Sequence, residues 1–339
     1  MNLTKKVILL GGSFDPIHYG HLKIVLHAIK QSQADEGWFI LAKQAPLKSE
    51  TQLSFNKRAE MVKMMIKSYS HLKLCSIENE LPAPNYTINT VTRLKELYPE
   101  NEFVFLIGSD QAENFDQWHS YQALLEMIEI MVYPREADDI IDQSIFTKLE
   151  APILDISSTN IRKGLSTATH PQILSTMIQK GYYSLEMIKQ ELDEDRIKHS
   201  LSVAKLAKEL ALIHGVDDEK AYALGLIHDY FKHKTSSSLR PYLSEDERQQ
   251  PDYLHHAYGL AHYISKVYYV RDREFLKAIY HHVTGNSGHK LAQILFIADK
   301  SEPLRHYPTE IYRKMAKTSL NHAVARIKKD IEEFERMNK

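Results

Sequence analysis

Two histidines stand three residues apart just after a glycine turn, and together they could handle a phosphate chain. Residues 11–22 have the sequence GGSFDPIHYGHL, which contains His18 and His21. Glycines let the backbone approach a phosphate closely, and the free N–H groups at a helix start favour an anion. No Gly-Lys-Ser/Thr tail follows, so the turn is not a P-loop. The pattern predicts an anion site at which both imidazoles face one phosphate chain.

A second group of residues combines histidine with aspartate. Twelve of the eighteen histidines lie after residue 184. His228 and Asp229 are adjacent, and Lys232 follows three residues later. Imidazole and carboxylate ligands from several helices suit divalent metals such as iron, manganese or zinc. Asp299 lies in an apolar segment, where an unpaired carboxylate is costly. We therefore expect a metal or cation partner for Asp299.

The elements that position the first group alternate between strand and helix. Short apolar runs predict strands at residues 7–10, 38–41, 72–77, 103–107, 130–133 and 153–156. Helical periodicity predicts helices at residues 21–32, 56–68, 87–97 and 121–127. This alternation favours an α/β domain with a parallel sheet covered by helices. Ligands on such sheets bind at the carboxyl ends of the strands, which is where the glycine turn falls.

The second half has a different pattern. Helices are predicted at residues 197–213, 219–232, 253–267, 273–282, 291–300 and 310–335. Strand-like runs are scarce after residue 184, so this half is expected to be all-α. We place the domain boundary between residues 184 and 185, giving domains of residues 1–184 and 185–339.

Composition narrows the class of protein. A chain of 339 residues is long enough for two domains. The net charge of −1 is unlike that of a general nucleic-acid binder. The one cysteine, Cys75, allows no internal disulfide and fits a reducing compartment. Without a signal-peptide pattern or an apolar run of membrane-spanning length, we expect a cytoplasmic protein with no membrane or nucleic-acid partner.

The glycine turn and four further motifs resemble the nicotinate mononucleotide adenylyltransferases. Residues 156–162 read ISSTNIR, a match to the family's second phosphate-binding element. Residues 86–91 read YTINTV, with Asn89 where the family has aspartate, and residues 107–110 read IGSD ahead of Trp118. The loop at residues 40–48 lacks the family's usual proline and histidine but keeps Lys48. The resemblance covers roughly residues 5–184 and implies a Rossmann-like nucleotidylyltransferase fold.

The resemblance also implies roles for individual residues. The expected catalytic residues are His18, His21, Lys48 and Arg162. The expected ATP- and substrate-binding residues are Gly11, Gly12, Ser13, Phe14, Thr87, Asp110, Trp118, Ser158 and Thr159. In the family the tryptophan stacks on the pyridine ring. The implied reaction transfers AMP from ATP to nicotinate mononucleotide with Mg²⁺, giving deamido-NAD and pyrophosphate. Another adenylyltransferase, such as one acting on phosphopantetheine, is the alternative.

The second half resembles the HD-domain phosphohydrolases. It is similar to the bacterial family that splits diadenosine tetraphosphate symmetrically into two ADP. The family's motifs R-Y-x-H, L-L-H-D-x-x-K, L-H-G, Y-H-T-T-G and L-A-D-x-x-E-P all have counterparts here. The implied ligands of a two-metal centre, with iron expected and manganese or zinc possible, are His199, His228, Asp229, His255, His282 and Asp299. Asp229 is expected to bridge the metals and Lys232 to contact phosphate.

Some assignments in the second half stay open. His256 replaces a motif glycine and His281 precedes His282, so either could be the ligand in place of its neighbour. The domain could instead act on another nucleotide or a cyclic nucleotide, or serve as a regulatory module without turnover. We expect a bifunctional enzyme for NAD biosynthesis and dinucleotide hydrolysis. Its expected partners are ATP, nicotinate mononucleotide and diadenosine tetraphosphate, and an oligomer is possible.

Overall fold

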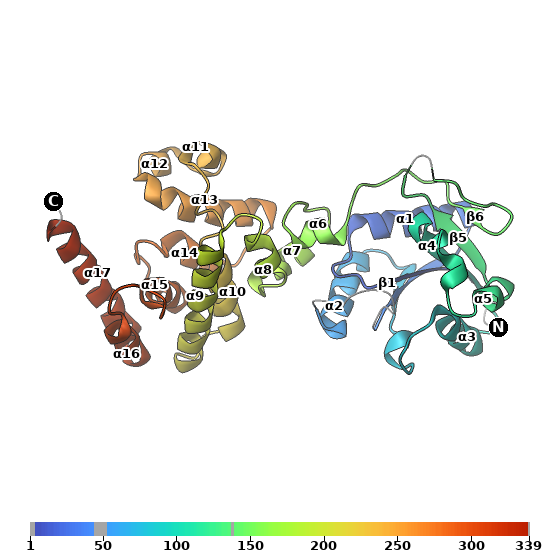
Figure 1. The fold of residues 1–339 in the computed structure, drawn as a ribbon, viewed down its shortest axis with the longest axis horizontal. Helices are drawn as coiled ribbons and strands as arrows, with labels where there is room; N and C mark the ends of the chain where they lie inside the picture. The colour runs from blue at the N-terminus through green and yellow to red at the C-terminus, as the bar shows by residue number, and fades with distance from the viewer. Residues whose placement is uncertain (1–3, 44–52, 137–138, 338–339) are drawn as a thin grey trace. The chain divides into compact units, whose positions relative to one another are not determined.

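The computed structural model describes residues 4–43, 53–136 and 139–337. The chain forms two compact units (Figure 1): Met1–Ile161 with Ala168–His170, and Arg162–Thr167 with Pro171–Lys339. The division therefore falls before the predicted boundary at residues 184 and 185. Helix α7 (Pro171–Gln179) packs against α10 (Asp218–Ile227), which places it in the second unit. Close packing continues at Gly181, where an added Cβ would lie 3.2 Å from the Cβ of Ala223.

The first unit is built on a six-stranded sheet in the order β3-β2-β1-β4-β5-β6. All of its pairings are parallel, which confirms the predicted fold class. The strands are β1 (Lys6–Gly12), β2 (Glu36–Leu41), β3 (Leu72–Cys75), β4 (Glu102–Gly108), β5 (Glu129–Tyr133) and β6 (Thr147–Lys148). The helical segments are α1 (Tyr19–Ser32), α2 (Phe55–Ile66), η1 (Ile77–Asn79), α3 (Thr87–Leu97), α4 (Ser109–Ala112), η2 (Phe115–Gln117), α5 (Tyr121–Met127) and α6 (Ser158–Arg162).

The strand order reverses between β1 and β4. The chain moves outward from β1 through β2 to β3 and then returns to β4 on the other side of β1. In open parallel sheets, ligands bind in the crevice beyond the carboxyl ends of the strands at such a point. Gly12 ends β1 and Gly108 ends β4. The glycine turn therefore lies at the position where this architecture most often binds a ligand.

The predicted strand at residues 153–156 is wrong. The edge position beside β5 is taken instead by β6, which pairs Thr147 with Met131 and Lys148 with Val132. Residues 151–157 have no regular structure, and Ile153 is 46% exposed. The backbone N–H of Leu154 donates to a tyrosine hydroxyl rather than to a strand. The apolar run at residues 153–156 therefore forms no strand, because β6 occupies the position beside β5.

The sheet positions the turn because its centre is closely packed. Val7 and Leu9 of β1 and Val132 of β5 are fully buried, and Phe105 of β4 packs in the same cluster. Burying apolar surface contributes about 25 cal/mol per Å² removed from water. The packed sheet therefore holds the end of β1, and the turn that follows it, in position.

The second unit consists of helices, as predicted. They are α7, α8 (Ser184–Ile188), α9 (Glu194–Ile213), α10, α11 (Ser236–Leu239), η3 (Arg240–Tyr242), α12 (Glu245–Arg248), α13 (Asp252–Val267), α14 (Arg273–His281), α15 (Lys290–Ser301), α16 (Glu310–Thr318) and α17 (Leu320–Met337). The predicted helix at residues 219–232 ends earlier, at Ile227. The one predicted at residues 310–335 is two helices, because Ser319 adopts extended backbone between them. Among the described residues, no helix combines the length and the apolarity that a membrane span requires.

Candidate functional sites

The glycine turn after β1 is held in a strained, close-packed shape. Phe14 has a φ of 47°, in the left-handed region, and its ring is buried. A Cβ on Gly12 would lie 2.8 Å from that ring, so only glycine fits there. Arg58 of α2 is buried and donates to the carbonyls of Ser13, Ala42 and Leu53. These contacts fix the path of the backbone around the proposed phosphate position.

His18 and His21 stack at the start of α1. Their ring centroids lie 3.7 Å apart at 27°. The backbone N–H of His18 donates to Nδ1 of His21 at 3.3 Å, so a neutral His21 carries its proton on Nε2. Burial lowers the pKa of His18 to about 4, with a further contribution from the charge of Arg135. A neutral imidazole can still donate one hydrogen bond to a phosphate oxygen.

The segment that follows residue 156, which the sequence predicts to be a second phosphate-binding element, contacts the glycine turn. The hydroxyl of Ser158 donates to the Pro16 carbonyl at 2.8 Å, and the hydroxyl of Thr169 donates to the Ile17 carbonyl at 2.7 Å. The Tyr19 N–H donates to a carbonyl in the same returning segment. The structure therefore brings together two motifs that lie about 140 residues apart in the chain, as the Ser158 bond spans 142 positions.

Arg135 was not predicted, although it belongs to the same strand-end region. Its guanidinium lies 3.0 Å from Oδ1 of Asp110, and its backbone N–H donates to the hydroxyl of Ser109. Its charge is close enough to His18 to lower the pKa of that imidazole. The sequence signal was its position two residues after a predicted strand, at the edge where ligands of parallel sheets bind. The exposed carboxylate of Asp110 is thus paired with the guanidinium of Arg135.

Five other residues of the first half are predicted to take part in this site. Trp118 is half-buried and contacts the rings of Phe105 and Phe115. Thr87 begins α3, Thr159 is exposed in α6, and the Arg162 guanidinium pairs with Glu186 of α8 at 3.2 Å. Lys48 lies outside the described residues. The roles expected for these five residues stay predictions.

One acidic side chain of the first unit is unusual. Burial raises the pKa of Glu78 to about 7, even though two hydrogen bonds to its carboxylate act in the opposite direction. Those donors are the Lys43 backbone N–H and the hydroxyl of Thr90. Nothing in the sequence distinguished this glutamate from its exposed neighbours, because its burial depends on the packing of η1 beside β2.

In the second unit, Asp229 lies between two groups of histidines. Its Oδ2 is 3.7 Å from Nε2 of His228 and 3.9 Å from Nε2 of His199. Its Oδ1 is 3.2 Å from Nε2 of His256 and 3.6 Å from Nε2 of His282. Each group offers ligand atoms close enough together to hold one metal ion. One carboxylate can therefore serve two cation positions.

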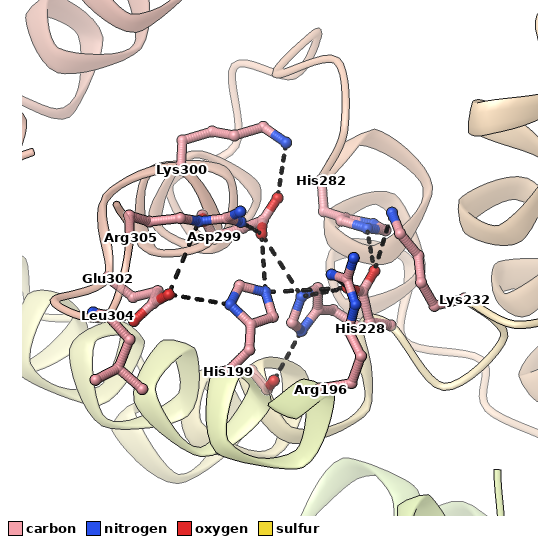
Figure 2. Close-up of polar contacts among 12 residues, drawn as sticks. Arg196, His199, His228, Lys232, His282, Asp299, Lys300, Glu302, Leu304 and Arg305 are labelled. Atoms are coloured by element: carbon pink, nitrogen blue, oxygen red, sulfur yellow. Dashed lines mark hydrogen bonds and ion pairs between the residues drawn. The ribbon is translucent and has the colours of Figure 1, made fainter. Parts of the chain in front are cut away.

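The imidazoles are oriented by hydrogen bonds from their outer nitrogens (Figure 2). Nδ1 of His228 lies 2.8 Å from the Gly225 carbonyl. Nδ1 of His282 lies 2.7 Å from the Ile279 carbonyl. A carbonyl only accepts, so each Nδ1 carries the proton and each Nε2 presents a lone pair. Nε2 of His228 is buried and has no hydrogen-bond partner. Such nitrogens fit a metal ion, and their backbone contacts are typical of metal-binding histidines.

Four cations surround the two aspartates of the cluster. Arg196 and Lys232 lie 3.2 and 3.7 Å from Asp229, and Lys300 and Arg305 lie 2.9 and 2.7 Å from Asp299. Burial raises the pKa of each aspartate, but neighbouring histidines and cations outweigh it and hold both pKa values well below the usual range. Burial lowers the pKa of His228 to about 3. The groups are thus in the protonation states that metal binding requires.

The choice of His255 as a ligand was wrong by geometry. Its Nδ1 lies 3.0 Å from the Ser236 hydroxyl, and its Nε2 lies 2.9 Å from the Gln250 carbonyl. His256 takes the place in the cluster, and its Nε2 lies 3.3 Å from Nε2 of His282. The choice of His282 over His281 agrees with the cluster, because His282 is buried within it and His281 is only half-buried.

Further contributors to this site come from two chain segments. Arg196 precedes His199 by three residues, so both lie on one face of α9. Glu302 is buried and lies 3.2 Å from Nδ1 of His199. Arg196 and Glu302 stand in the counterparts of the R-Y-x-H and L-A-D-x-x-E-P motifs, but the sequence alone predicted no role for either residue. Charged residues three positions from a ligand on a helix were the signal that could have found Arg196.

Two family models match the chain, one in each half. The model described as cytidylyltransferase-like matches residues 9–164, and the model described as HD domain matches residues 196–304. An HD domain implies a divalent metal ion, and the histidine–aspartate cluster supplies buried nitrogen and oxygen ligands for it. The first match contains the glycine turn, and the second contains every member of the cluster.

Among the relatives found, three match either most of the chain or about half of it. A Mycoplasma genitalium protein named "Probable nicotinate-nucleotide adenylyltransferase/Ap4A hydrolase" is 30% identical over 89% of this chain and 89% of its own length. A Mycoplasma pneumoniae protein of the same name is 27% identical over 88% and 89%. A Christiangramia forsetii "Probable nicotinate-nucleotide adenylyltransferase" is 38% identical over 48% and 87%. The chain belongs to the family of fused nicotinate-nucleotide adenylyltransferase/Ap4A hydrolases.

Proposed function

We propose that the first unit transfers AMP from ATP to nicotinate mononucleotide and that the second cuts diadenosine tetraphosphate into two molecules of ADP. The observation that carries the proposal is the occurrence, in one chain, of a phosphate-binding turn and of an aspartate shared by two histidine groups. Both activities act on a phosphate chain attached to adenosine. The names of the two full-length relatives support the same pair of activities.

In the proposed transfer, the mononucleotide phosphate attacks the α-phosphorus of ATP and pyrophosphate leaves. His18 and His21 donate hydrogen bonds to the phosphate that is transferred. Such preorganised donors stabilise charge that develops in the transition state. Mg²⁺, which prefers oxygen ligands, would be held largely by the phosphates and would offset their charge. Lys48 and Arg162 are proposed to add positive charge.

The remaining predicted residues are proposed to hold the two substrates in line. Gly11, Gly12, Ser13 and Phe14 form the turn around the ATP phosphates, with Ser158 and Thr159 on the opposite segment. The half-exposed indole of Trp118 supports stacking on a flat, electron-poor pyridine ring. Thr87 and Asp110 are proposed to contact the mononucleotide or the ribose. Alignment of two reactants can by itself account for much of such a rate enhancement.

In the proposed hydrolysis, one water molecule is consumed and each product keeps two phosphates. The ions would be held by His199, His228, Asp229, His256, His282 and Asp299. Divalent ions bound there would supply Lewis acidity at the phosphorus that is cut. Lys232, Arg196, Lys300 and Arg305 provide positive charge for the tetraphosphate. We propose two ions per chain, with iron expected and manganese or zinc as alternatives that suit the same imidazole ligands.

Product analysis tests both halves of the proposal. The purified chain is incubated with ATP and either nicotinate or nicotinamide mononucleotide, and separately with diadenosine tetraphosphate or a cyclic nucleotide. Deamido-NAD with equimolar pyrophosphate, and ADP as the single hydrolysis product, are the expected results. Release of AMP with ATP would show asymmetric cleavage instead. Turnover of a cyclic nucleotide in place of the tetraphosphate would contradict the second assignment.

A further inference from the structure

We infer that the two metal positions of the second unit are unequal, and that Glu302 is the positioning residue that makes the His199 position the tighter one. The inference deepens the proposed function, because it rests on the two-ion centre proposed there. It concerns which ion is held more firmly and why. No ligand of the cluster is reassigned by it.

The two sides of Asp229 differ in their ligand atoms. On the Oδ2 side lie His199 and His228, and Asp299 adds a second carboxylate 3.2 Å from Nε2 of His199 and 3.8 Å from Nε2 of His228. On the Oδ1 side lie His256 and His282. Among the described residues, the first position thus combines two imidazoles with two carboxylates, and the second combines two imidazoles with one. The second carboxylate gives a divalent cation one more anionic ligand at the first position. Arg196, Lys300 and Arg305 offset the charge of these two carboxylates without taking the place of a ligand.

Nε2 of His199 and Oδ1 of Asp299 need a cation between or beside them. With its proton on Nδ1, His199 presents a lone pair on Nε2, 3.2 Å from a carboxylate oxygen that also only accepts. Two acceptors this close repel one another unless a cation is shared. Arg305 and Lys300 offset part of the charge of Asp299. Nε2 of His199 is buried without a hydrogen-bond partner among the described residues and can therefore bind the metal.

Glu302 holds His199 in this state. Its Oε1 lies 3.2 Å from Nδ1 of His199, and its Oε2 accepts a hydrogen bond from the Leu304 backbone N–H at 2.7 Å (Figure 2). The side chain is 2% exposed. Both oxygens of the carboxylate are therefore used as acceptors, one for the backbone and one for the imidazole. A proton on Nδ1 is the state of His199 that this arrangement stabilises.

A carboxylate does more for a ligating histidine than a carbonyl does. His228 and His282 use the backbone carbonyls of Gly225 and Ile279 as acceptors. Only His199, among the cluster imidazoles with a contact of this kind in the described chain, uses a carboxylate. A carboxylate partner fixes the tautomer and raises the basicity of the metal-binding nitrogen. The stronger ligand thus belongs to the position that already has the second aspartate.

Glu302→Gln separates this role from simple structural support. An amide has one acceptor oxygen, so it can accept from the Leu304 N–H or from His199, but not from both. If its NH₂ group faces Nδ1, His199 must move its proton to Nε2 and lose its metal-binding lone pair. Packing volume is preserved in this variant. The change therefore acts on the tautomer of His199, and it also removes the ion pair of Glu302 with Arg305 at 3.8 Å.

Glu247 provides a matched control in the same unit. It is also buried, its Oε2 accepts from the Ser244 backbone N–H at 2.8 Å, and its Oε1 lies 2.9 Å from Nε2 of His262. His262 lies outside the metal cluster. Glu247→Gln thus breaks the same pair of contacts without touching a ligand. A purely structural cost of the glutamine would be similar in both variants.

The experiment measures Co²⁺ binding to the full chain after its metals have been removed with a chelator. Competition with a chromophoric chelator yields the two stepwise dissociation constants for the wild type and both variants, and thermal melting without metal checks folding. Two separated steps are expected for the wild type. In Glu302→Gln the tighter step should weaken by roughly 10–100-fold, the range for outer-shell partners of metal ligands, while the weaker step and Glu247→Gln are unchanged.

Four results would each overturn the inference. These are a single common affinity in the wild type, no Co²⁺ binding in the wild type, unchanged binding in Glu302→Gln, and equal losses in both variants. The outcome is independent of turnover. If diadenosine tetraphosphate is not cut but the tighter step weakens as expected, the proposed function fails and the inference stands. If the tetraphosphate is cut into ADP but Glu302→Gln binds Co²⁺ like the wild type, the proposed function stands and the inference fails.

Discussion

Nε2 of His256 lies 3.2 Å from Oδ1 of Asp229, while the ring of its neighbour His255 bonds to Ser236 and Gln250. Both histidines are on α13, where consecutive side chains point about 100° apart. Only one of them can therefore face the cluster. Both are buried, at 4% and 5% exposure, so burial alone does not tell them apart. The phase of the helix decides which imidazole can bind a metal.

This relationship predicts opposite results for two adjacent substitutions. His256→Ala should remove one ligand at the Oδ1 side of Asp229, lower the metal content from two ions toward one per chain, and reduce diadenosine tetraphosphate hydrolysis at least tenfold. His255→Ala should keep two ions per chain and the wild-type rate of hydrolysis, because its contacts are to a hydroxyl and a carbonyl outside the cluster. Metal analysis and ADP formation on the two purified variants make the comparison. A larger loss in His255→Ala would reverse the assignment.

Asp229→Asn tests the shared carboxylate. Asparagine keeps the size of the side chain but offers one acceptor oxygen and no charge, so neither histidine group keeps its bridge. We expect loss of bound metal and loss of ADP formation, with adenylyl transfer unchanged. Asp246→Asn, at an exposed position of α12, is the control and should behave like the wild type. Tetraphosphate hydrolysis at the wild-type rate in Asp229→Asn would rule out the cluster as the active site.

His18→Ala tests the phosphate turn. The substitution removes one hydrogen-bond donor to the transferred phosphate, and losses of roughly 100–1,000-fold are typical for such a group. Pyrophosphate release from ATP and nicotinate mononucleotide should fall by that factor. Metal content and tetraphosphate hydrolysis should stay the same, which makes the second activity an internal control. An undiminished transfer rate would remove the basis of the first assignment.

Arg58→Met tests the support beneath the turn. Arg58 is 1% exposed and satisfies the carbonyls of Ser13, Ala42 and Leu53. Leaving a buried acceptor without its donor costs about 1–3 kcal/mol, so the first unit should unfold at a lower denaturant concentration. Adenylyl transfer should fall as well. Arg93→Met breaks an exposed pair with Glu96, where a change of at most about 0.5 kcal/mol is expected. Equal midpoints for the two variants would contradict this role of Arg58.

Glu78→Gln should stabilise the protein at high pH but not at low pH. Burial raises the pKa of Glu78 from an ordinary 4.5 to about 7. Between these values the folded chain binds a proton that the unfolded chain releases, so stability falls as the pH rises through this window. Glutamine can accept from the Lys43 N–H and donate to Thr90 without carrying a charge.

The measurement compares the melting of Glu78→Gln with that of the wild type at pH 5 and pH 8. The gain at pH 8 should be on the order of 2 kcal/mol, since tenfold in proton affinity corresponds to about 1.4 kcal/mol. At pH 5 the difference should be small. Glu80→Gln changes an exposed neighbour and should show no such pH dependence. The same gain at both pH values would show that ionisation of Glu78 is not the cause.

The local pattern of residues predicted much of the architecture. Five of the strands and the long helices follow from apolar runs and helical periodicity, because these patterns report which faces are buried. The edge strand β6 was missed, since two residues carry too little pattern, and residues 153–156 were predicted in its place. Pairing at a sheet edge depends on which segment arrives there, and a local pattern contains no information about that.

The sequence by itself determined the chemistry: two histidines at a helix start for phosphate, and histidines and aspartates in helices for a metal. The tertiary structure alone decided which side chains meet. It selects His256 over His255 and places Glu302 against His199 across 103 positions of the chain. Residue type sets what a group can donate, accept or ligate. Its direction and its partners depend on helix phase, helix ends and long-range packing, which only the folded chain determines.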